Sequence, residues 1–446
     1  MTNMAPTHHE NAGGRETIVA LATGQVRSAV AILRLSGPGS RFALETIAGG
    51  CPDPRRASLR SLRAPGTGEV LDHALVFWFP GPASFSGEDM AEFHLHGGTA
   101  VIKAVMAALL DIPRCRLAEP GEFSRRAFLA GRLDLSEAEG IADLVDAETE
   151  LQRRQALRQM DGALSAVTMG WRDRLADCLA EVEAELDFSD EGDVPDNLVD
   201  GVGPRVAQVR AEIAAAISDG RRGERLREGF TVVIAGAPNA GKSTLFNRLL
   251  QREAAIVTPV PGTTRDVLEA ALDIDGLPVM LVDTAGLRST EDLIETEGIR
   301  RALVRAERAD LVLALEALDS PPQPSEWQAP TLRVWTKRDL REAPVGFDGL
   351  AISSTRDQGI AQLLHVIADR AREALGNGSA LVTRERHRNA LTAALSALER
   401  GLEPAKPPEL FAEDLRLALR GLGRVTGHVG VEEILDRVFS SFCIGK

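Results

Sequence analysis

The segment Gly236-Ala237-Pro238-Asn239-Ala240-Gly241-Lys242-Ser243 constrains the fold of this chain of 446 residues more than any other. It matches the pattern G-x-x-x-x-G-K-S/T, between an apolar run at 231–235 and a segment at 244–250 with helical character. Glycines there allow backbone N–H groups to face phosphates at the positive end of a helix. Lys242 is placed to reach the β- and γ-phosphates, and the Ser243 hydroxyl to hold Mg²⁺. A chance match in a glycine-rich turn would lack the flanking strand and helix, so we expect a nucleoside triphosphate site.

The segments downstream indicate that the base is guanine. A predicted strand at 279–282 leads into Asp283-Thr284-Ala285-Gly286, where Asp283 can hold Mg²⁺ through water and Gly286 can offer its N–H to the γ-phosphate. Strands are also expected at 311–315 and 332–335. The second runs into Thr336-Lys337-Arg338-Asp339, which is similar to the N-K-x-D element of GTPases. Its Asp accepts two hydrogen bonds that adenine cannot donate. Thr336 replaces the Asn and alters one polar contact, and Ser353 lies in a weaker base-side loop.

A predicted mobile loop at 258–266 places Thr264 where it can close on Mg²⁺ and the γ-phosphate. Leu287 stands where Ras-like enzymes carry the Gln that orients the attacking water. Leucine cannot do so, and therefore either hydrolysis is slow or another group positions the water. The acidic segment 291–297 is a candidate supplier, although its composition alone favours a solvent-exposed start of a helix.

Composition limits the remaining possibilities. The length predicts two to three domains, and 44% hydrophobic residues suffice for sizeable cores. Four scattered cysteines indicate neither a metal site nor a disulfide framework. There is no apolar run of about 18 residues, and the first residues lack the apolar centre of a signal peptide, so we expect a cytoplasmic protein without a membrane partner. The net charge of −14 disfavours a broad nucleic-acid-binding face.

Residues 17–126 have the pattern of a mixed α/β region, with strands expected at 30–35, 75–79 and 90–96. Alternation along the first strand puts Arg34 on the face of Val30 and Ile32. Along the third strand, Glu92, His94 and His96 share one face. Three ionisable groups in a row suit a polar pocket, and they also suit an ordinary solvent-facing strand.

Helical patterns surround the nucleotide-binding region. A long helical segment is expected from about Ser136, with an apolar stripe from Met160 to Leu186, followed by a helix at roughly 200–225. Residues 383–440 are again helical. We therefore expect a GTPase domain inserted between two helical halves that pack as one bundle. The expected domain bounds are 1–126, 127–225, 226–376 and 377–446.

Several motifs together resemble the MnmE (TrmE) family of tRNA-modification GTPases over nearly the whole chain. They are Pro120-Gly121-Glu122-Phe123-Ser124, Arg126-Ala127-Phe128-Leu129, Leu133-Asp134-Leu135, Pro238-Asn239-Ala240-Gly241-Lys242-Ser243, Gly262-Thr263-Thr264-Arg265-Asp266 and Phe442-Cys443-Ile444-Gly445-Lys446. The resemblance implies an N-terminal α/β folate-binding domain that dimerises, a split helical bundle domain, and an inserted Ras-like P-loop GTPase domain. It also implies an FAD-dependent partner of the MnmG (GidA) type. With that partner, the family adds an aminomethyl-type group to C5 of the wobble uridine of certain tRNAs, which are contacted mainly through the complex. The one-carbon unit comes from a tetrahydrofolate derivative.

The resemblance also assigns roles in the GTPase domain. Asn239 matches the asparagine that binds K⁺, with oxygens of Thr258, Val260 and Thr263 completing that site. Glu295 matches the catalytic residue that orients water, which answers the question raised by Leu287, and Ser243 and Thr264 match the Mg²⁺ ligands. K⁺ would stabilise charge between the phosphates and favour pairing of two G domains. The implied contacts with GTP are Asn239, Ala240, Gly241, Lys242, Ser243, Thr244, Thr258, Thr263, Thr264, Asp283, Thr284, Ala285, Gly286, Thr336, Lys337, Asp339 and Ser353.

For the tetrahydrofolate derivative, the matching positions are Arg34, Glu92, Arg132 and Lys446. A carboxylate such as Glu92 can accept paired hydrogen bonds from a pterin, and the basic groups of Arg132 and Lys446 suit the carboxylates of the glutamate. Leu95 stands where the family usually has Gly, and we expect it to narrow the folate pocket. The role of Cys443 stays open.

The sequence thus predicts a K⁺-dependent GTPase, activated by dimerisation of its G domains, that acts in wobble-uridine modification. The alternative from another class is a regulatory G-protein switch in ribosome assembly. Such a protein should carry a basic RNA-binding appendage, whereas this chain is acidic.

Overall fold

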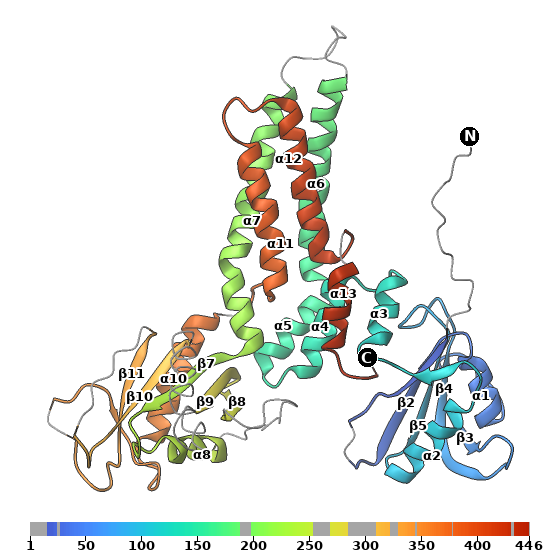
Figure 1. Cartoon of the computed structure of the whole chain (residues 1–446), viewed down its shortest axis with the longest axis horizontal. Coiled ribbons are helices and arrows are strands. Elements are labelled where there is room, and N and C mark those ends of the chain that lie inside the picture. The colour runs from blue at the N-terminus through green and yellow to red at the C-terminus, as the bar shows by residue number, and fades with distance from the viewer. Residues whose placement is uncertain are drawn as a thin grey trace, which may run out of the picture. The chain divides into compact units, whose positions relative to one another are not determined.

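A computed structural model describes residues 16–24, 27–187, 198–252, 268–283, 309–321, 329–343, 346–376, 378–429 and 432–445 (Figure 1). Packing divides the chain into two compact units. Residues 1–142 and 427–446 form the N-terminal unit, and residues 143–426 form the central unit. Residues 427–446, expected in the second helical half, therefore pack with the first part of the chain.

The described part of the N-terminal unit is built on a sheet of order β3-β4-β5-β2-β1-β6. Strands β1 and β6 pair in parallel, and the other neighbours are antiparallel. The strands are β1 (Thr17–Leu21), β2 (Val30–Ser36), β3 (Ser58–Arg63), β4 (Val70–Phe79), β5 (Met90–His96) and β6 (Cys115–Leu117). The helices of this unit include α1 (Ser40–Ala48), α2 (Thr99–Leu110), α3 (Glu122–Leu129) and α13 (Glu432–Ser440), and α4 (Leu135–Asp146) follows α3.

The two faces of this sheet have different cores. On one face, Leu33, Phe93 and Leu95 pack with Leu44 of α1 and Leu109 of α2. On the other face, a smaller cluster joins Ile18 and Met90 to Phe123 of α3. Because side chains alternate along a strand, Arg34 of β2 and Glu92 and His94 of β5 point to the second face.

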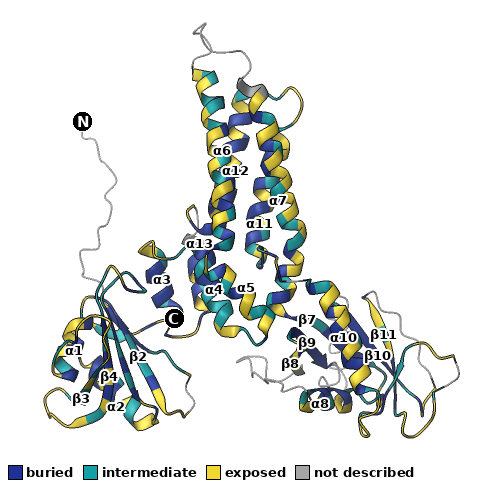
Figure 2. Ribbon diagram, turned by 180° about the vertical axis from the view of Figure 1, so that it is seen from behind, coloured by how far each residue is buried: buried dark blue, intermediate teal, exposed yellow. Residues whose placement is uncertain are grey.

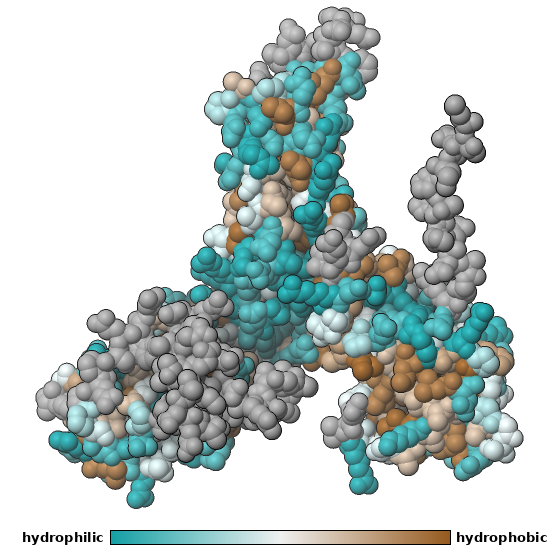
Figure 3. All heavy atoms as spheres, in the orientation of Figure 1, coloured by the Kyte–Doolittle hydropathy of each residue, from teal (hydrophilic) through white to brown (hydrophobic). Residues whose placement is uncertain are grey.

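Several apolar side chains of this sheet are exposed. Leu59 of β3 is 72% exposed, Val30 of β2 is 51% exposed, and Leu75 and Val70 of β4 are each 42% exposed. Register pairs Leu59 with Leu75 on neighbouring strands. Figure 3 shows hydrophobic atoms, in brown, gathered over the N-terminal unit. Contiguous apolar surface of this kind typically marks an interaction site.

In the central unit, four long described helices pack side by side as a bundle: α6 (Ala163–Asp187), α7 (Leu198–Glu228), α11 (Glu385–Gly401) and α12 (Pro408–Thr426). Buried residues, dark blue in Figure 2, lie along their facing sides. Val206 of α7 and Leu391 of α11 share one core with Leu175 of α6 and Leu415 of α12. The expected packing of two helical halves into one bundle is confirmed.

The long helical segment expected from Ser136 is interrupted twice, which corrects that prediction. Thr149 caps α5 (Glu150–Met160): its side chain accepts a hydrogen bond from the Gln152 N–H, and the Gln152 side chain bonds back to Thr149. After α5, Gly162 adopts a φ of 81°, and α6 begins at Ala163. Met160 therefore ends α5, while the buried stripe lies on α6. The spacing of apolar residues in the sequence does not reveal these breaks.

Between α7 and α11, the central unit contains a second described sheet of order β12-β11-β10-β7-β9-β8. It is parallel except for the hairpin of β8 and β9. The elements are β7 (Phe230–Gly236), α8 (Lys242–Arg252), β8 (Leu268–Ile274), β9 (Leu277–Asp283), β10 (Leu311–Ala317), β11 (Thr331–Thr336), β12 (Leu350–Ala351) and α10 (Ile360–Leu375). Val232 and Leu281 of the sheet pack with Leu245 of α8 and Ile367 of α10. This is the expected inserted α/β fold.

Candidate functional site

The phosphate-binding loop connects β7 to α8, and its first glycine is required by the packing. Gly236 has a φ of 150°, and a Cβ built there would lie 2.5 Å from the carbonyl oxygen of Leu315 on β10. A larger residue would push the two parallel strands apart. Asn239, in the middle of the loop, has a left-handed φ of 62°, and its side chain is exposed. The loop thus adopts a tight and strained conformation of the kind found at binding sites.

Two groups at the start of α8 have the chemistry expected of a triphosphate site. Lys242 Nζ donates to the carbonyl oxygens of Gly236 and Ala237, at 2.7 and 2.8 Å, so its charge lies within the loop. Ser243 Oγ donates to Asp283 Oδ2 at 3.2 Å, and Asp283 is fully buried at the end of β9. A hydroxyl and a carboxylate are the oxygen donors that Mg²⁺ prefers, so these two residues fit that ion.

The base-side loop is tied to the phosphate-binding loop by Thr336. This residue ends β11 and is 4% exposed, and its Oγ1 donates to the carbonyl oxygen of Ala240 at 2.7 Å. Lys337, with a φ of 62°, is paired with Asp319 at 2.7 Å. A hydroxyl at position 336 therefore holds the two loops together.

Asp339 is held by the loop after β12. Thr355 Oγ1 donates to Asp339 Oδ2 at 3.3 Å. Hydrogen bonding to Ser353, and then to Thr355, lowers the pKa of the Asp339 carboxyl. The carboxylate therefore stays ionised, as is needed to accept hydrogen bonds from a base.

The residues proposed for GTP gather at the carboxyl ends of parallel strands, where ligands bind in open α/β sheets. Gly241 and Thr244 lie at the start of α8, beside Lys242 and Ser243. The remaining proposed residues lie outside the described ones: Thr258, Val260, Thr263, Thr264, Thr284, Ala285, Gly286 and Glu295 of the nucleotide site, and Lys446 of the folate site.

In the N-terminal unit, a cavity of about 420 Å³ brings together Arg34, Glu92 and Arg132. Arg34 of β2 and Glu92 of β5 are direct partners in the sheet register. Arg34 Nε donates to Glu92 Oε1 at 2.9 Å, and His94 Nε2 lies 3.1 Å from Glu92 Oε2. The sheet thus places a guanidinium and a carboxylate side by side in the cavity wall.

One part of the polar face of β5 lines a pocket and another part faces solvent, so each alternative from the sequence holds for part of the strand. Glu92 faces the cavity with a side chain only 16% exposed, whereas the His96 side chain is 71% exposed. His96 Nδ1 lies 2.7 Å from Asp72 Oδ1. Burial alone would raise the pKa of Asp72, but hydrogen bonds from His96 and His73 outweigh burial and lower it.

The same cavity contains residues that sequence reasoning missed, namely Arg55, Phe79 and Phe85. Phe85 follows a predicted turn, and Arg55 lies in the proline-rich segment after α1, so no periodic pattern singles them out. The expectation that Leu95 narrows the pocket is wrong for this cavity. Leu95 is 1% exposed in the core on the other face of the sheet, because alternation separates it from Glu92.

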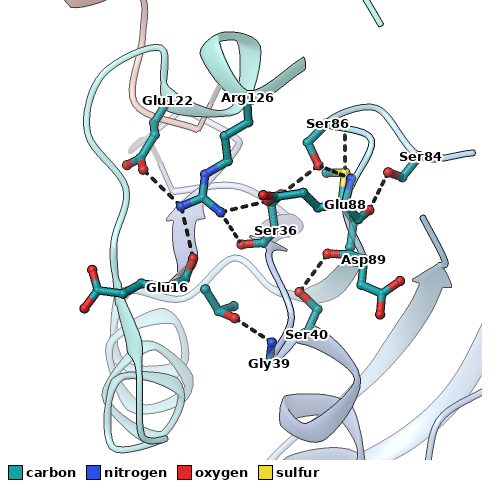
Figure 4. Close-up of polar contacts among 12 residues, drawn as sticks. Glu16, Ser36, Gly39, Ser40, Ser84, Ser86, Glu88, Asp89, Glu122 and Arg126 are labelled. Carbon is teal, nitrogen blue, oxygen red and sulfur yellow. Dashed lines mark hydrogen bonds and ion pairs between the residues drawn. The ribbon is translucent and has the colours of Figure 1, made fainter. Parts of the chain in front are cut away.

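Arg126 of α3 anchors the loop that carries Phe85 (Figure 4). The Arg126 guanidinium is paired with Glu88 at 2.8 Å and with Glu122 at 3.1 Å. It also donates to the carbonyl oxygens of Ser36 and Glu16, at 3.2 and 3.0 Å. A nearly buried charge requires such partners, because its desolvation offsets much of the attraction within each ion pair.

Comparisons with known proteins cover nearly the whole chain. A model described as "GTP-binding protein TrmE N-terminus" matches residues 17–132, and one described as "MnmE helical domain" matches residues 135–443. The chain is 60% identical over 435 residues to a tRNA modification GTPase MnmE of Methylorubrum populi, covering 97% of this chain and 98% of the relative. It is 58% identical to the protein of the same name from Methylobacterium sp. strain 4-46, covering 97% of this chain and all of the relative.

A solved structure, the G domain of the T. maritima FeoB iron transporter, is 25% identical and covers 32% of this chain and 98% of its own. Its TM-score is 0.26. Among the described helices, none has the length and apolarity needed to cross a membrane. Within the same described residues, no cluster of three His, Cys, Asp or Glu side chains is arranged to hold a metal ion.

Proposed function

The chain belongs to the MnmE family of tRNA modification GTPases, and on this premise we propose that it hydrolyses GTP at the loop 236–243 during the modification of tRNA. The observation that carries the proposal is the contact between Ser243 and Asp283, at 3.2 Å, next to a lysine held within a phosphate-binding loop. At the base end, the ionised Asp339 supports a preference for guanine.

Each group has a distinct task in this proposal. Ser243 and Asp283 would hold Mg²⁺, and the ion would neutralise charge on the phosphates. Lys242 contacts the β- and γ-phosphates, and the backbone N–H groups of the loop bind the same oxygens. From family resemblance, we add that Thr264 closes on Mg²⁺ and that Glu295 orients the attacking water.

We further propose that hydrolysis depends on K⁺ and on pairing of two G domains. Asn239 is exposed in the middle of the loop, with a side chain that can offer an oxygen to a cation. Oxygens of Thr258, Val260 and Thr263 would complete the site. Stabilising charge between the β- and γ-phosphates is a task that an arginine finger performs in other GTPases.

Steady-state GTP hydrolysis in KCl and in NaCl tests this proposal, with Asn239→Ala and Glu295→Ala measured in parallel. We expect strong stimulation by K⁺ that Asn239→Ala loses, and nearly no activity in Glu295→Ala. Equal rates in the two salts would remove the K⁺ mechanism and leave an ordinary slow GTPase switch.

For the N-terminal unit, we propose that the cavity around Arg34 and Glu92 binds a tetrahydrofolate derivative that supplies a one-carbon unit. Glu92 would accept hydrogen bonds from the pterin, and Arg132 and Lys446 would bind carboxylates. With an FAD-dependent partner of the MnmG type, the protein would add an aminomethyl-type group to C5 of the wobble uridine. The cavity volume of about 420 Å³ and its paired charges support this proposal.

We propose that the protein is a cytoplasmic homodimer joined through its N-terminal unit. The exposed apolar side chains Val30, Leu59 and Leu75 on its sheet support such an interface. We also propose functional boundaries at residues 126, 225 and 376. Separate hydrophobic cores for the second sheet and for the helical bundle support the boundaries at 225 and 376.

A further inference from the structure

Arg55 lines the cavity of Arg34 and Glu92, although no motif points to it. Its segment follows α1 and precedes β3, and its backbone N–H donates to the carbonyl oxygen of Trp78 at 2.8 Å. Its guanidinium lies 5.9 Å from the centre of the Phe79 ring and donates to the carbonyl oxygen of Ala83. An aromatic face and a carbonyl thus orient the guanidinium at the cavity wall.

The backbone conformation of Arg55 supports a role in ligand binding. Its φ is 60°, a left-handed conformation that costs about 1–2 kcal/mol in a residue other than glycine. Among the described residues, six other non-glycine residues have a positive φ, and two of them, Asn239 and Lys337 at 62° each, lie in the nucleotide loops. Such strain persists where neighbouring contacts hold the residue, and it is concentrated at binding sites.

The charges in the cavity do not balance. Three guanidiniums, those of Arg34, Arg55 and Arg132, face one carboxylate, that of Glu92. Arg34 is paired with Glu92 at 2.9 Å. Across the described part of the chain, no carboxylate lies within ion-pair distance of Arg55 or Arg132. The cavity therefore presents two positive charges that a ligand can neutralise.

From this excess of charge we infer that Arg55 binds a carboxylate of the ligand, which for a reduced folate is a carboxylate of its glutamate. The inference rests on the proposed folate site and adds a residue to it. A guanidinium offers two parallel N–H donors that match the two oxygens of a carboxylate. In sheet register Phe79 is paired with Met90, two residues along β5 from Glu92. Arg55 therefore lies beyond Glu92 along the sheet, where the end of the ligand farther from the pterin can reach it.

The neighbouring Arg56 provides a matched control. It carries the same charge on the same segment and is exposed, as Arg55 is, but it does not line the cavity. Its described backbone contact is a hydrogen bond from its N–H to the carbonyl oxygen of Asp53. Changing Arg56 to Gln removes one positive charge near the site without touching the cavity wall.

The test measures dissociation constants by calorimetry on the full chain, for 5-formyltetrahydrofolate and for a tetrahydropterin that lacks the p-aminobenzoylglutamate. In Arg55→Gln we expect affinity for the folate to fall by about tenfold to a hundredfold, the loss of one charged hydrogen-bonded contact. Affinity for the tetrahydropterin without the p-aminobenzoylglutamate should not change. Arg56→Gln should leave both affinities unchanged, and Arg55→Lys should retain part of the preference for the folate.

Three results would overturn the inference. An equal loss for both ligands in Arg55→Gln would mean that Arg55 supports the cavity wall or touches the pterin. Unchanged affinity for both would mean that Arg55 does not contact the ligand. If the wild-type protein binds neither compound, the proposed folate site itself fails, and the assignment of Arg55 fails with it. Melting temperatures of the two glutamine variants separate a folding defect from lost recognition.

Discussion

At the scale of single residues, Thr336 shows how a departure from a motif can be accommodated. The residue stands where the related base-reading element has Asn, and the sequence alone indicates an altered polar contact. In the fold, its hydroxyl donates at 2.7 Å to the carbonyl oxygen of Ala240 in the phosphate-binding loop. Thr336 is 4% exposed, so no water replaces this bond readily.

The first prediction concerns this bond. Thr336→Val keeps the shape and removes the hydroxyl, leaving the buried carbonyl of Ala240 without its donor. We expect about 1–3 kcal/mol lower stability and weaker binding of GDP, measured by denaturation and by nucleotide titration. Thr331→Val is the control, because Thr331 Oγ1 bonds to Ala329 at 2.9 Å near the exposed start of the same strand. If both variants lose the same stability and the same affinity for GDP, the hydrogen bond from Thr336 to the phosphate-binding loop has no special role.

At the scale of elements, α3 is held at both ends by glycines in left-handed conformations. Gly121 before it has a φ of 67°, and Gly131 after it has a φ of 65°. A Cβ on Gly121 would lie 2.4 Å from the carbonyl oxygen of Phe439 on α13, whereas a Cβ on Gly131 would meet nothing within 4 Å. The two positions share a backbone strain and differ in the space available.

The second prediction uses this difference. Gly131→Ala should cost about 1–2 kcal/mol, the strain of the left-handed conformation alone. Gly121→Ala should cost roughly 1–3 kcal/mol more, because α13 has to move away from α3. Urea denaturation of both variants measures the two costs. Equal losses would show that α13 yields freely at this contact.

The third prediction concerns the acid sensitivity of α3. Burial would raise the pKa of Glu122, but hydrogen bonds from Arg116 and from the Glu119 N–H outweigh burial and lower it below its ordinary value of 4.5. A lowered folded-state pKa stabilises the fold above that value, and this stabilisation is lost as pH falls below it. Glu122→Gln should therefore cost about 2 kcal/mol at pH 7, and the difference from wild type should shrink below pH 4.5.

Glu150→Gln is the control for this measurement. Hydrogen bonds from Arg153 and Arg154 lower the pKa of Glu150 to about 2, yet all three side chains are exposed and water screens the pairs. We expect little change in stability for this variant at any pH between 3 and 7. A loss as large as that of Glu122→Gln would mean that burial does not decide the strength of these pairs.

At the scale of the whole molecule, the sheet of the N-terminal unit exposes apolar side chains, although the chain as a whole is acidic, with a net charge of −14. Leu59 and Leu75 face each other across neighbouring strands. Their exposure supports the proposed dimer, because burial in an interface gains roughly 25 cal/mol for each Å² of apolar surface.

The fourth prediction tests that interface. Leu59→Asp combined with Leu75→Asp should convert a dimer into a monomer, since two buried charges cannot be solvated in an apolar interface. Sedimentation equilibrium on the full chain measures the mass. Leu410→Asp, at an exposed position of α12 in the other unit, should leave the mass unchanged. A double variant that remains dimeric would place the interface elsewhere.

By itself the sequence determined the inserted α/β fold and the helical halves, because a strand-loop-helix motif and an apolar stripe are local patterns of a few turns. It also placed Arg34 on the face of Val30 and Ile32, and Glu92 on the face of His94 and His96, since alternation has a period of two. The breaks before α5 and α6 were missed because a capping box and one glycine interrupt a helix without disturbing the apolar spacing. Only the tertiary structure brought Arg55 and Glu92 into one cavity and Thr336 beside Ala240. Such contacts join segments far apart in the chain, and they depend on strand order and on packing that no local pattern encodes.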